Sequence, residues 1–208
     1  MEETKKGLLI VVTGPAGSGK GTVLANIVNE GDCAYSVSAT TRKPRPGEID
    51  GVNYHFMSVE EFKEHIANND FLEHAEYVGN HYGTLLSEIN GKREKGIHVI
   101  LELEVQGAAN VKRLYPDAVL IWILPPDYAT LESRLRGRAT ETEEVIQKRM
   151  QTAIKELGSF DMFDYIVLNE DGRSYEASRA LRAIITAEQH KVSRTDSFVK
   201  KFMSTKID

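Results

Sequence analysis

Cysteine is nearly absent from the sequence, and long apolar runs are absent altogether. Cys33 is the single cysteine and cannot form a disulfide within the chain, while the six histidines show no HExxH or Cys-His spacing of a zinc site. The apolar run over residues 8–13 is far shorter than the roughly 20 residues that cross a bilayer. We therefore expect a protein of the reducing cytoplasm, without a membrane span and without a metal cage built from side chains.

A surplus of positive charge is also missing. Lysine and arginine number 26 against 31 aspartates and glutamates, which gives a formal net charge of -5. Without a global positive field, general binding to nucleic acid or to an anionic membrane is not expected, and any anionic ligand must meet a local basic cluster. The 208 residues, 41% of them hydrophobic, can build one substantial core, so we expect one domain with mobile subdomains.

What the sequence does contain is a repeated alternation of short apolar runs and helical patterns. The runs are rich in valine and isoleucine, as in strands that are buried on both faces. Five such runs cover residues 8–13, 35–39, 97–104, 118–124 and 165–169. This alternation predicts an α/β fold, in which a parallel sheet is joined by right-handed crossovers and carries helices on both faces.

Three helix starts can be placed from local signals. Ser58 stands three residues before Glu61 in the pattern of a capping box, and Thr140 stands in the same relation to Glu143. A last long helix is predicted to begin near Ser174.

Two stretches interrupt the alternation. Residues 36–87 are rich in glycine, proline and tyrosine, which predicts an inserted, partly antiparallel subdomain of mixed α/β type. Residues 126–157 are helical and basic, and we expect them to act as a lid over a site on the core. The predicted core then comprises residues 1–35, 88–125 and 158–190, and a helical tail follows at 191–208.

A glycine-rich segment, GPAGSGKGT, lies between the first predicted strand and a helical pattern. Glycines let backbone N–H groups converge on phosphate oxygens, a helix N-terminus adds positive potential, and Lys20 can reach the β- and γ-phosphates of a nucleotide. A glycine-rich turn with a chance lysine is the alternative. The residues expected to bind ATP here are Gly14, Pro15, Ala16, Gly17, Ser18, Gly19, Lys20, Gly21 and Thr22.

Gly21 departs from the usual form of this loop, in which a serine or threonine after the lysine contacts Mg²⁺. The GKGT form resembles that of nucleoside monophosphate kinases, in which phosphates and water can hold most of the metal. The resemblance implies Mg²⁺ as the cofactor. Thr22 or Glu102 would then contact it through water, and no direct protein ligand is assigned.

A second informative segment is TTRKPRPGEIDGVNYHFM, residues 40–57. Arg42 and Arg45 flank a proline, so two guanidinium groups can converge on one small dianion, and Tyr54 and Tyr82 can add uncharged donors. A solvated basic turn is the alternative. The segment resembles the signature of the guanylate kinase family, and with the phosphate loop the resemblance extends over residues 8–188.

The resemblance implies Mg²⁺-dependent transfer of the ATP γ-phosphoryl group to GMP, and also to dGMP. Glu73 would accept from N1 and N2 of guanine, while Ser38 and Thr84 would donate to O6. AMP presents the reverse pattern, and such a mismatch can discriminate by about 10⁴-fold. An ordinary exposed acid at a helix end is the alternative for Glu73. The residues implied to bind GMP are Ser38, Arg42, Arg45, Tyr54, Glu73, Tyr82, Thr84, Glu102 and Glu104.

Glu102 and Glu104 stand two residues apart at the end of one apolar run. We expect both side chains on one face of a strand near its carboxyl end, where ligands of open parallel sheets bind. The resemblance implies that the pair faces GMP and the hydration shell of the metal, although the family usually carries aspartate at these places. A purely structural role is the alternative for each.

The segment RLRGRATETEEVIQKRM resembles the family's lid. Arg138 and Arg149 match the arginines that close on the transferred phosphoryl group, and with Lys20 and Arg42 they form the implied catalytic set. Arg134 either assists them or lies on a solvated helix face. No catalytic base is required, because the acceptor is already an anionic oxygen and the reaction needs positioning and charge cancellation.

Asn169 lies in an LNED block that resembles the family's VNDD, which implies a contact with the adenine of ATP. The alternative is an ordinary turn residue after a strand.

Two other functions remain open from the sequence. One is a catalytically silent guanylate-kinase-like module that binds phosphorylated peptides, and the intact Gly14, Gly19 and Lys20 argue against it. The other is a monophosphate kinase for a different nucleotide, which Glu73 and Arg42 argue against. The expected partners are ATP and GMP, with no nucleic acid and no membrane, and the sequence leaves a homodimer open.

Overall fold

A five-stranded sheet forms the main body of the protein. The computed structural model describes residues 6–28, 31–77, 79–137 and 142–204. The strands lie in the order β2-β7-β1-β8-β9, and each neighbouring pair is parallel. Their bounds are β1 Leu9–Thr13, β2 Cys33–Tyr35, β7 His98–Glu102, β8 Val119–Leu124 and β9 Tyr165–Leu168. The predicted α/β fold with a parallel sheet is confirmed.

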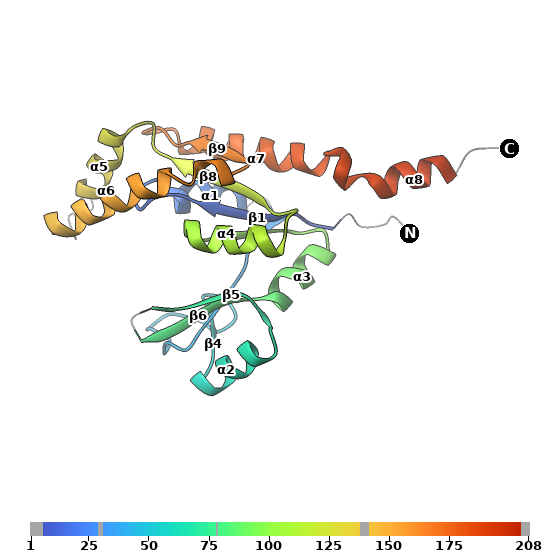
Figure 1. Ribbon diagram of the computed structural model, residues 1–208, viewed down its shortest axis with the longest axis horizontal. Helices are drawn as coiled ribbons and strands as arrows, with labels where there is room; N and C mark the ends of the chain where they lie inside the picture. The colour runs from blue at the N-terminus through green and yellow to red at the C-terminus, as the bar shows by residue number, and fades with distance from the viewer. Residues whose placement is uncertain (1–5, 29–30, 78, 138–141, 205–208) are drawn as a thin grey trace.

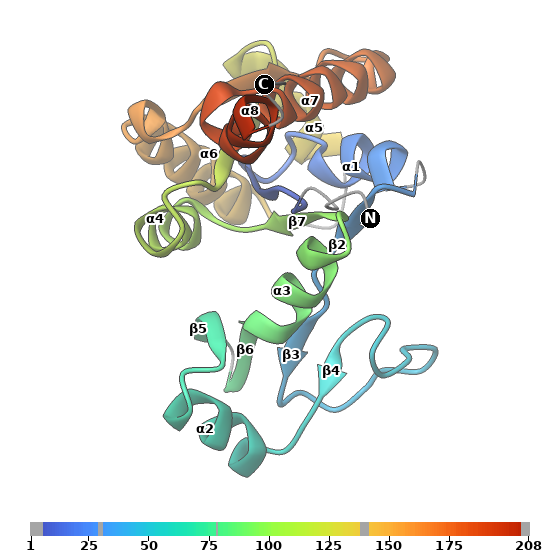
Figure 2. The same cartoon turned by 90° about the vertical axis from the view of Figure 1, so that its right-hand side faces the viewer.

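Helices cover both faces of this sheet (Figure 2). On one face α1 (Lys20–Val28) and α7 (Ser174–Gln189) pack over Ile10 and Val12 of β1. On the other face α3 (Leu86–Glu94) and α4 (Val105–Leu114) pack over Leu9 and Val11. Alternate side chains of one strand thus enter two separate cores, as the two-residue strand period requires. The predicted start of the last long helix at Ser174 is confirmed.

A second, smaller sheet lies below the main body in the view of Figure 1. Its strand order is β4-β3-β6-β5, with β3 parallel to β4 and antiparallel to β6. The bounds are β3 Ser38–Thr40, β4 His55–Phe56, β5 Phe71–Tyr77 and β6 Asn80–Leu85. Helix α2 (Val59–Ala67) packs on it through the fully buried Phe62. The predicted capping box of Ser58 and Glu61 is confirmed, since each side chain bonds the other's backbone N–H.

The prediction of one strand over residues 35–39 is wrong. The chain instead leaves the first sheet after β2 and enters the second at β3, with Ser36 and Val37 between them. The N–H of Ser36 still donates to the carbonyl of Ile100 in the first sheet, at 3.2 Å. Ser38 already pairs with Thr84 in the second sheet. Apolar and polar residues keep alternating from Tyr35 to Ala39, so the sequence pattern gives no sign of the change of sheet.

Two further helices lie beside the phosphate-loop edge of the main sheet. Helices α5 (Tyr128–Gly137) and α6 (Glu143–Leu157) share a small apolar core that also contacts Ala16. The predicted N-cap at Thr140, which lies outside the described residues, is wrong, because α6 begins at Glu143 with Thr142 as its N-cap. Glu143 accepts a hydrogen bond of 2.8 Å from Arg136 on α5, so its carboxylate joins the two helices.

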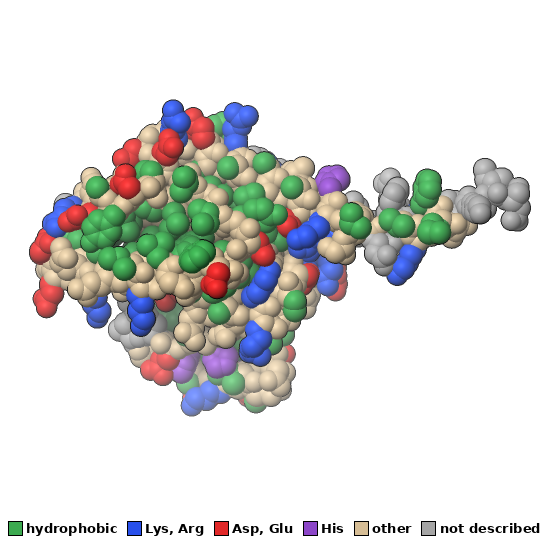
Figure 3. All heavy atoms as spheres, turned by 45° about the horizontal axis from the view of Figure 1, so that its top comes forward, with side chains coloured by type: hydrophobic (Ala, Val, Ile, Leu, Met, Phe, Trp, Pro, Cys, Tyr) green, Lys and Arg blue, Asp and Glu red, His purple; other side chains and the backbone are tan. Residues whose placement is uncertain are grey.

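The end of the chain forms a helical projection. After the short 3-10 turn η2 (Val192–Arg194), helix α8 (Asp196–Ser204) extends away from the body, as Figure 3 shows on the right. Arg194 anchors its base by donating to the buried Glu188, with 3.0 Å between Nη2 and Oε2. Another 3-10 turn, η1 (Phe160–Met162), precedes β9. Within the described ranges, no helix combines the length and apolarity needed to cross a membrane.

His98 ties the start of the main sheet to α7. Its ring is buried, and Nδ1 accepts a hydrogen bond of 2.9 Å from the backbone N–H of Leu8. The ring proton must therefore lie on Nε2, 2.7 Å from the side-chain amide of Gln189, which has to present its oxygen. Burial, with a smaller effect from the Arg182 charge, lowers the pKa of His98 despite the opposing charge of Asp32.

Stability should fall in acid because of His98. In the unfolded chain this histidine binds a proton near pH 6.5, whereas in the folded chain it does so only at lower pH. The contribution of neutral His98 to the free energy of unfolding is therefore complete above about pH 6.5 and is lost as the pH falls below it. One such group adds at most about 1.4 kcal/mol per pH unit. Urea unfolding between about pH 8 and about pH 5 measures the slope.

Two substitutions isolate this contribution. In His98→Gln, which cannot titrate at this position, the free energy of unfolding should fall less steeply with decreasing pH than in the unchanged protein. This acid part of the pH dependence is called the acid limb. His190→Gln removes an exposed histidine and should leave the limb as it was. An equally steep limb in His98→Gln would show that other groups cause the acid loss.

Candidate active site

The phosphate loop connects the carboxyl end of β1 to the start of α1. Gly17 and Gly19 have φ angles of 91° and 81°, a region that favours glycine, and the N–H of Ser18 closes a turn on the Pro15 carbonyl at 3.1 Å. Lys20 is the first residue of α1. Its Nζ donates to the carbonyl of Gly14 at 2.5 Å, so the ammonium group folds back over the loop.

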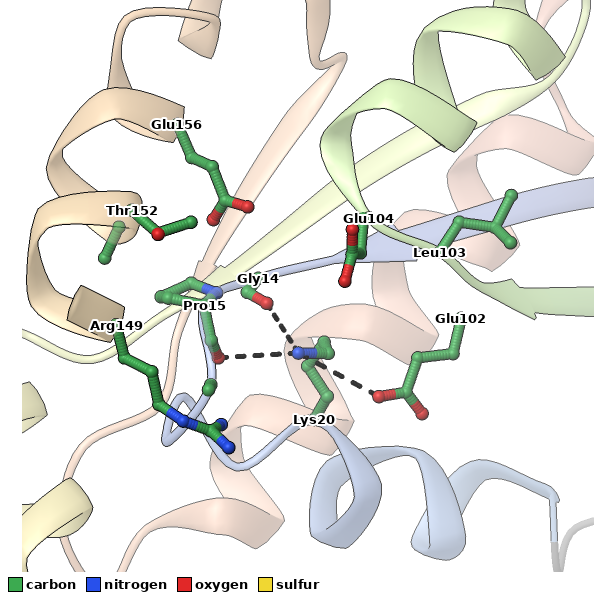
Figure 4. A pocket seen from close by; sticks show the side chains of 11 residues that line it. Gly14, Pro15, Lys20, Glu102, Leu103, Glu104, Arg149, Thr152 and Glu156 are labelled. Carbon is green, nitrogen blue, oxygen red and sulfur yellow. Dashed lines mark hydrogen bonds and ion pairs between the residues drawn. The ribbon is translucent and has the colours of Figure 1, made fainter. Parts of the chain in front are cut away.

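A pocket of about 490 Å³ opens beside this loop, and Figure 4 shows its lining. Lys20 lies 3.9 Å from Glu102 at the end of β7. The pocket carries both signs of charge, with cations suited to phosphates and carboxylates suited to a hydrated metal ion. Its lining residues are Gly14, Pro15, Ala16, Lys20, Glu102, Leu103, Glu104, Arg149, Thr152, Ala153 and Glu156.

The predicted placement of Glu104 on a strand is wrong. β7 ends at Glu102, and Glu104 is the N-cap of α4. Its carboxylate still enters the same pocket as that of Glu102, because the helix starts directly at the sheet edge (Figure 4). The expected juxtaposition therefore holds, although strand alternation is not its cause.

Glu156 is a pocket residue to which the sequence patterns assigned no role. It lies on α6 seven residues after Arg149, so both side chains leave the same helix face and point toward the loop (Figure 4). Burial and then the negative charge of Glu104 raise the pKa of Glu156, while Lys20 opposes the rise. The spacing from Arg149 is the signal that could have identified it.

Three strands of the smaller sheet bring the predicted base-binding residues together. Ser38 on β3 and Glu73 on β5 both pair with Thr84 on the β6 strand between them. The Thr84 hydroxyl donates a hydrogen bond of 2.7 Å to Oε1 of Glu73, which fixes the orientation of the carboxylate. A cavity of about 390 Å³ contains Ser38, Thr84 and also Glu102 in its lining.

Arg42 is held in place by a carboxylate. Its Nη2 donates to both oxygens of Glu48, at 2.8 and 2.9 Å, and hydrogen bonding to Glu48 raises the pKa of Arg42. Its guanidinium lies 5.4 Å from the ring centre of Tyr54, and that ring contacts Tyr82. Arg45 donates to Glu48 through its backbone N–H, and its side chain is exposed. The sequence patterns gave Glu48 no role of its own.

Two of the remaining predicted residues, Arg134 and Asn169, contact each other and the carbonyl of Ser18 in the phosphate loop. Arg134 donates to the carbonyl of Asn169 at 2.8 Å and to Asp171 at 2.9 Å from Nε, so its contacts lie at the base of the site. Asn169 donates through Nδ2 to the Ser18 carbonyl at 2.7 Å. Arg138 lies outside the described residues.

Comparison with known proteins identifies the family. Residues 6–188 match the family model for guanylate kinase. The chain belongs to the guanylate kinase family. The guanylate kinase of Streptococcus thermophilus (strain CNRZ 1066) is 47% identical over 205 residues, covering 98% of this chain and 97% of that protein. The guanylate kinase of Clostridioides difficile (strain 630) is 46% identical, covering 94% of this chain and 95% of that protein.

A solved structure agrees with this membership. The crystal structure of guanylate kinase from Anaplasma phagocytophilum superposes with a TM-score of 0.69 at 31% identity, covering 91% of this chain and 90% of that chain. The family predicted from the phosphate loop and from residues 40–57 is therefore confirmed. Membership also favours the predicted kinase over a silent binding module or a kinase for another nucleotide.

In this member of the guanylate kinase family, Glu102 joins the two halves of the site. It lines the pocket of the phosphate loop and also the cavity that holds Ser38 and Thr84. One carboxylate therefore borders the expected places of both nucleotides.

Proposed function

We propose that the chain transfers the γ-phosphoryl group of ATP to GMP, and likewise to dGMP, forming ADP and the nucleoside diphosphate. Family membership supports this reaction, since the family model and a curated relative that matches 98% of the chain are both named guanylate kinase. The observation that carries the proposal is the continuity of the site through Glu102, with the phosphate loop on one side and Ser38 and Thr84 on the other.

ATP would bind along the loop from Gly14 to Thr22. Its phosphates would accept hydrogen bonds from the loop N–H groups and from the start of α1. Lys20 would turn from the Gly14 carbonyl to the β- and γ-phosphates, where it stabilises the departing ADP. Asn169 lies directly behind this loop.

GMP would bind between the two sheets. Its phosphate would meet Arg42, Arg45, Tyr54 and Tyr82, and Glu48 supports Arg42 in the required position. Guanine N1 and N2 would donate to the oriented Glu73 carboxylate. Ser38 would donate to O6, as would Thr84 once its hydroxyl proton turns from Glu73. Glu104 would lie near the phosphate-transfer region.

Transfer needs alignment and charge cancellation from the protein. Lys20 and Arg42 would hold the two reacting phosphates in line, and the lid would bring Arg149 and Arg138 to the moving γ group. Arg149 already lines the loop pocket. The acceptor phosphate oxygen attacks as an anion, so no side chain has to remove a proton.

The residues beside the loop fit a hydrated Mg²⁺ ion. Thr22 and Glu102 both line a cavity of about 310 Å³ at the loop, and a Cβ at Gly21 would meet no described atom within 4 Å. Across the described residues, no group of three or more His, Cys, Asp or Glu could hold a metal ion. In the proposed complex, nucleotide phosphates and water would supply most ligands. Bound Mg²⁺ would neutralise charge on the β- and γ-phosphates.

The location, assembly and subdomains are further parts of the proposal. Cys33 is a buried free thiol, and burial raises its pKa to about 12. We propose the cytoplasmic setting that the sequence predicts. Exposed Val199 and Met203 on α8 offer apolar surface for the homodimer that the sequence leaves open. We assign residues 36–87 to the GMP-binding subdomain and 126–157 to the lid, around the second sheet and helices α5 and α6.

A panel of acceptors tests the proposed reaction. Purified protein with ATP and Mg²⁺ is supplied in turn with GMP, dGMP, AMP, CMP, UMP and dTMP, and ADP is measured. We expect rapid ADP formation with GMP and dGMP alone. Turnover that favours AMP would reject the specificity assigned to Glu73, and no turnover with any acceptor would favour a binding module.

A further inference from the structure

Asn169 is held tightly behind the phosphate loop. The residue is 4% exposed, and its Nδ2 donates to the Ser18 carbonyl at 2.7 Å. A carbonyl can only accept, so the amide must present its nitrogen to Ser18. The Asn169 backbone is fixed as well, because its N–H donates to Leu124 and its carbonyl accepts from Arg134, each at 2.8 Å. The Asn169 amide is therefore a rigid contact for the loop.

This contact determines how one loop peptide is oriented. In a planar trans peptide the C=O and N–H bonds point in opposite directions. With the Ser18 carbonyl held against Asn169, the N–H of Gly19 must point away from Asn169, toward the front of the loop. Gly19 there lines the cavity of about 310 Å³ that Lys20 also lines. A backbone N–H at this position can donate to a phosphate oxygen.

The fit between loop and amide leaves no spare room. A Cβ at Gly19 would lie 2.3 Å from Nδ2 of Asn169, so a larger residue would displace the amide. Arg134 adds a second, longer contact of 3.4 Å to the Ser18 carbonyl, while Asp171 holds its guanidinium. The end of β9 and helix α5 thus converge on a single carbonyl oxygen of the loop.

We propose that Asn169 is a positioning residue for the triphosphate, acting by orienting the Ser18–Gly19 peptide and without needing a contact to adenine. The inference deepens the proposed function and rests on it for the identity of the triphosphate. It predicts that a ligand with phosphates and no base is affected as strongly as ATP.

The decisive variant is Asn169→Asp, which keeps the side-chain shape but faces the Ser18 carbonyl with an oxygen in place of a donor. Calorimetric titration, with Mg²⁺ present, gives Kd for ATP and for inorganic tripolyphosphate in the full chain. We expect both Kd values to rise together by about tenfold or more, since a hydrogen bond is lost and two acceptors are opposed. The Kd for GMP should stay within about twofold.

Asn26→Asp is the matched control. Asn26 lies on α1, the helix that follows the loop, and donates through Nδ2 to Ser178 at 3.0 Å. Loss of this hydrogen bond perturbs α1 without affecting the carbonyl of Ser18. Both triphosphate affinities should be unchanged in this variant.

Four outcomes would overturn the proposal. Weaker binding of ATP with unchanged binding of tripolyphosphate would show that Asn169 contacts the adenine base. Unchanged affinity for both ligands would show that Asn169 has no role in binding them. An equal loss of GMP affinity would indicate general damage, and failure of the unmodified protein to bind tripolyphosphate would remove the premise. The triphosphate titrations use no acceptor, so they give their answer even if the GMP kinase assignment fails.

Discussion

Replacing Lys20 with methionine is expected to lower kcat/KM for ATP by about 10³-fold while the fold persists. Lys20 lies where α1 starts, with its ammonium group against the Gly14 carbonyl and 3.9 Å from Glu102. No other described lysine lines the two loop pockets. Charge that grows on the departing ADP would therefore lose its nearest lysine. Methionine keeps most of the stem length and removes only the charge and donors.

Two measurements separate this loss from unfolding. The thermal midpoint of Lys20→Met should stay close to that of the unchanged protein, because the partners of the removed ammonium group include the loop carbonyl of Gly14 and the carboxylate of Glu102 at the pocket. Lys63→Met, on the exposed side of α2, is the matched control and should retain full activity. A fall of less than about tenfold in Lys20→Met would refute the assignment of the phosphate loop.

The phosphate loop is the part of the site that the sequence predicts best, because its chemistry is local. Glycines at positive φ and a lysine at the first helical residue are all set by neighbours within nine positions, GPAGSGKGT. A strand before it and a helix after it were each visible as a short pattern. Local order and local function here depend on the same residues.

Contacts between distant segments are the part that sequence patterns do not give. Asn169 reaches Ser18 across 151 positions, and Glu156 faces Glu104 only because α6 folds beside the sheet edge. The change of sheet at Ser36 and Val37 has the same origin, since strand alternation continues through it. In each case tertiary packing decides the partner, and periodicity carries no information about it.

For two site residues, Arg42 and Thr84, the sequence predicts the role but not the partner that each has within the protein. Arg42 was expected to bind phosphate, and in the structure a carboxylate, Glu48, accepts from the same guanidinium. Thr84 was expected to donate to a base, and its hydroxyl instead donates to Glu73. Both residues thus contact protein acceptors that have the polarity of the ligand groups proposed for them.

Substituting Glu73 with glutamine is expected to lower kcat/KM for GMP by about 10² to 10³-fold and to reduce the preference for GMP over AMP. The Thr84 hydroxyl donates to Oε1 of Glu73 in the structure, and once that proton turns to guanine O6, both carboxylate oxygens are left for the two guanine donors. Glutamine keeps one accepting oxygen but places an N–H₂ group against a guanine N–H. Two hydrogen bonds to a charged acceptor, each worth about 1.5 to 3 kcal/mol, are thereby weakened or lost.

Glu76→Gln makes the same change three residues along β5, where the side chain is exposed, and it should leave both acceptors unaffected. AMP offers an acceptor at N1, so the new amide donor of Glu73→Gln can pair with it, and AMP turnover should hold or rise as GMP turnover falls. Steady-state kinetics with both nucleotides gives the ratio directly. Equal losses for GMP and AMP would mean that Glu73 supports the sheet without sensing the base, and unchanged GMP kinetics would remove it from the site.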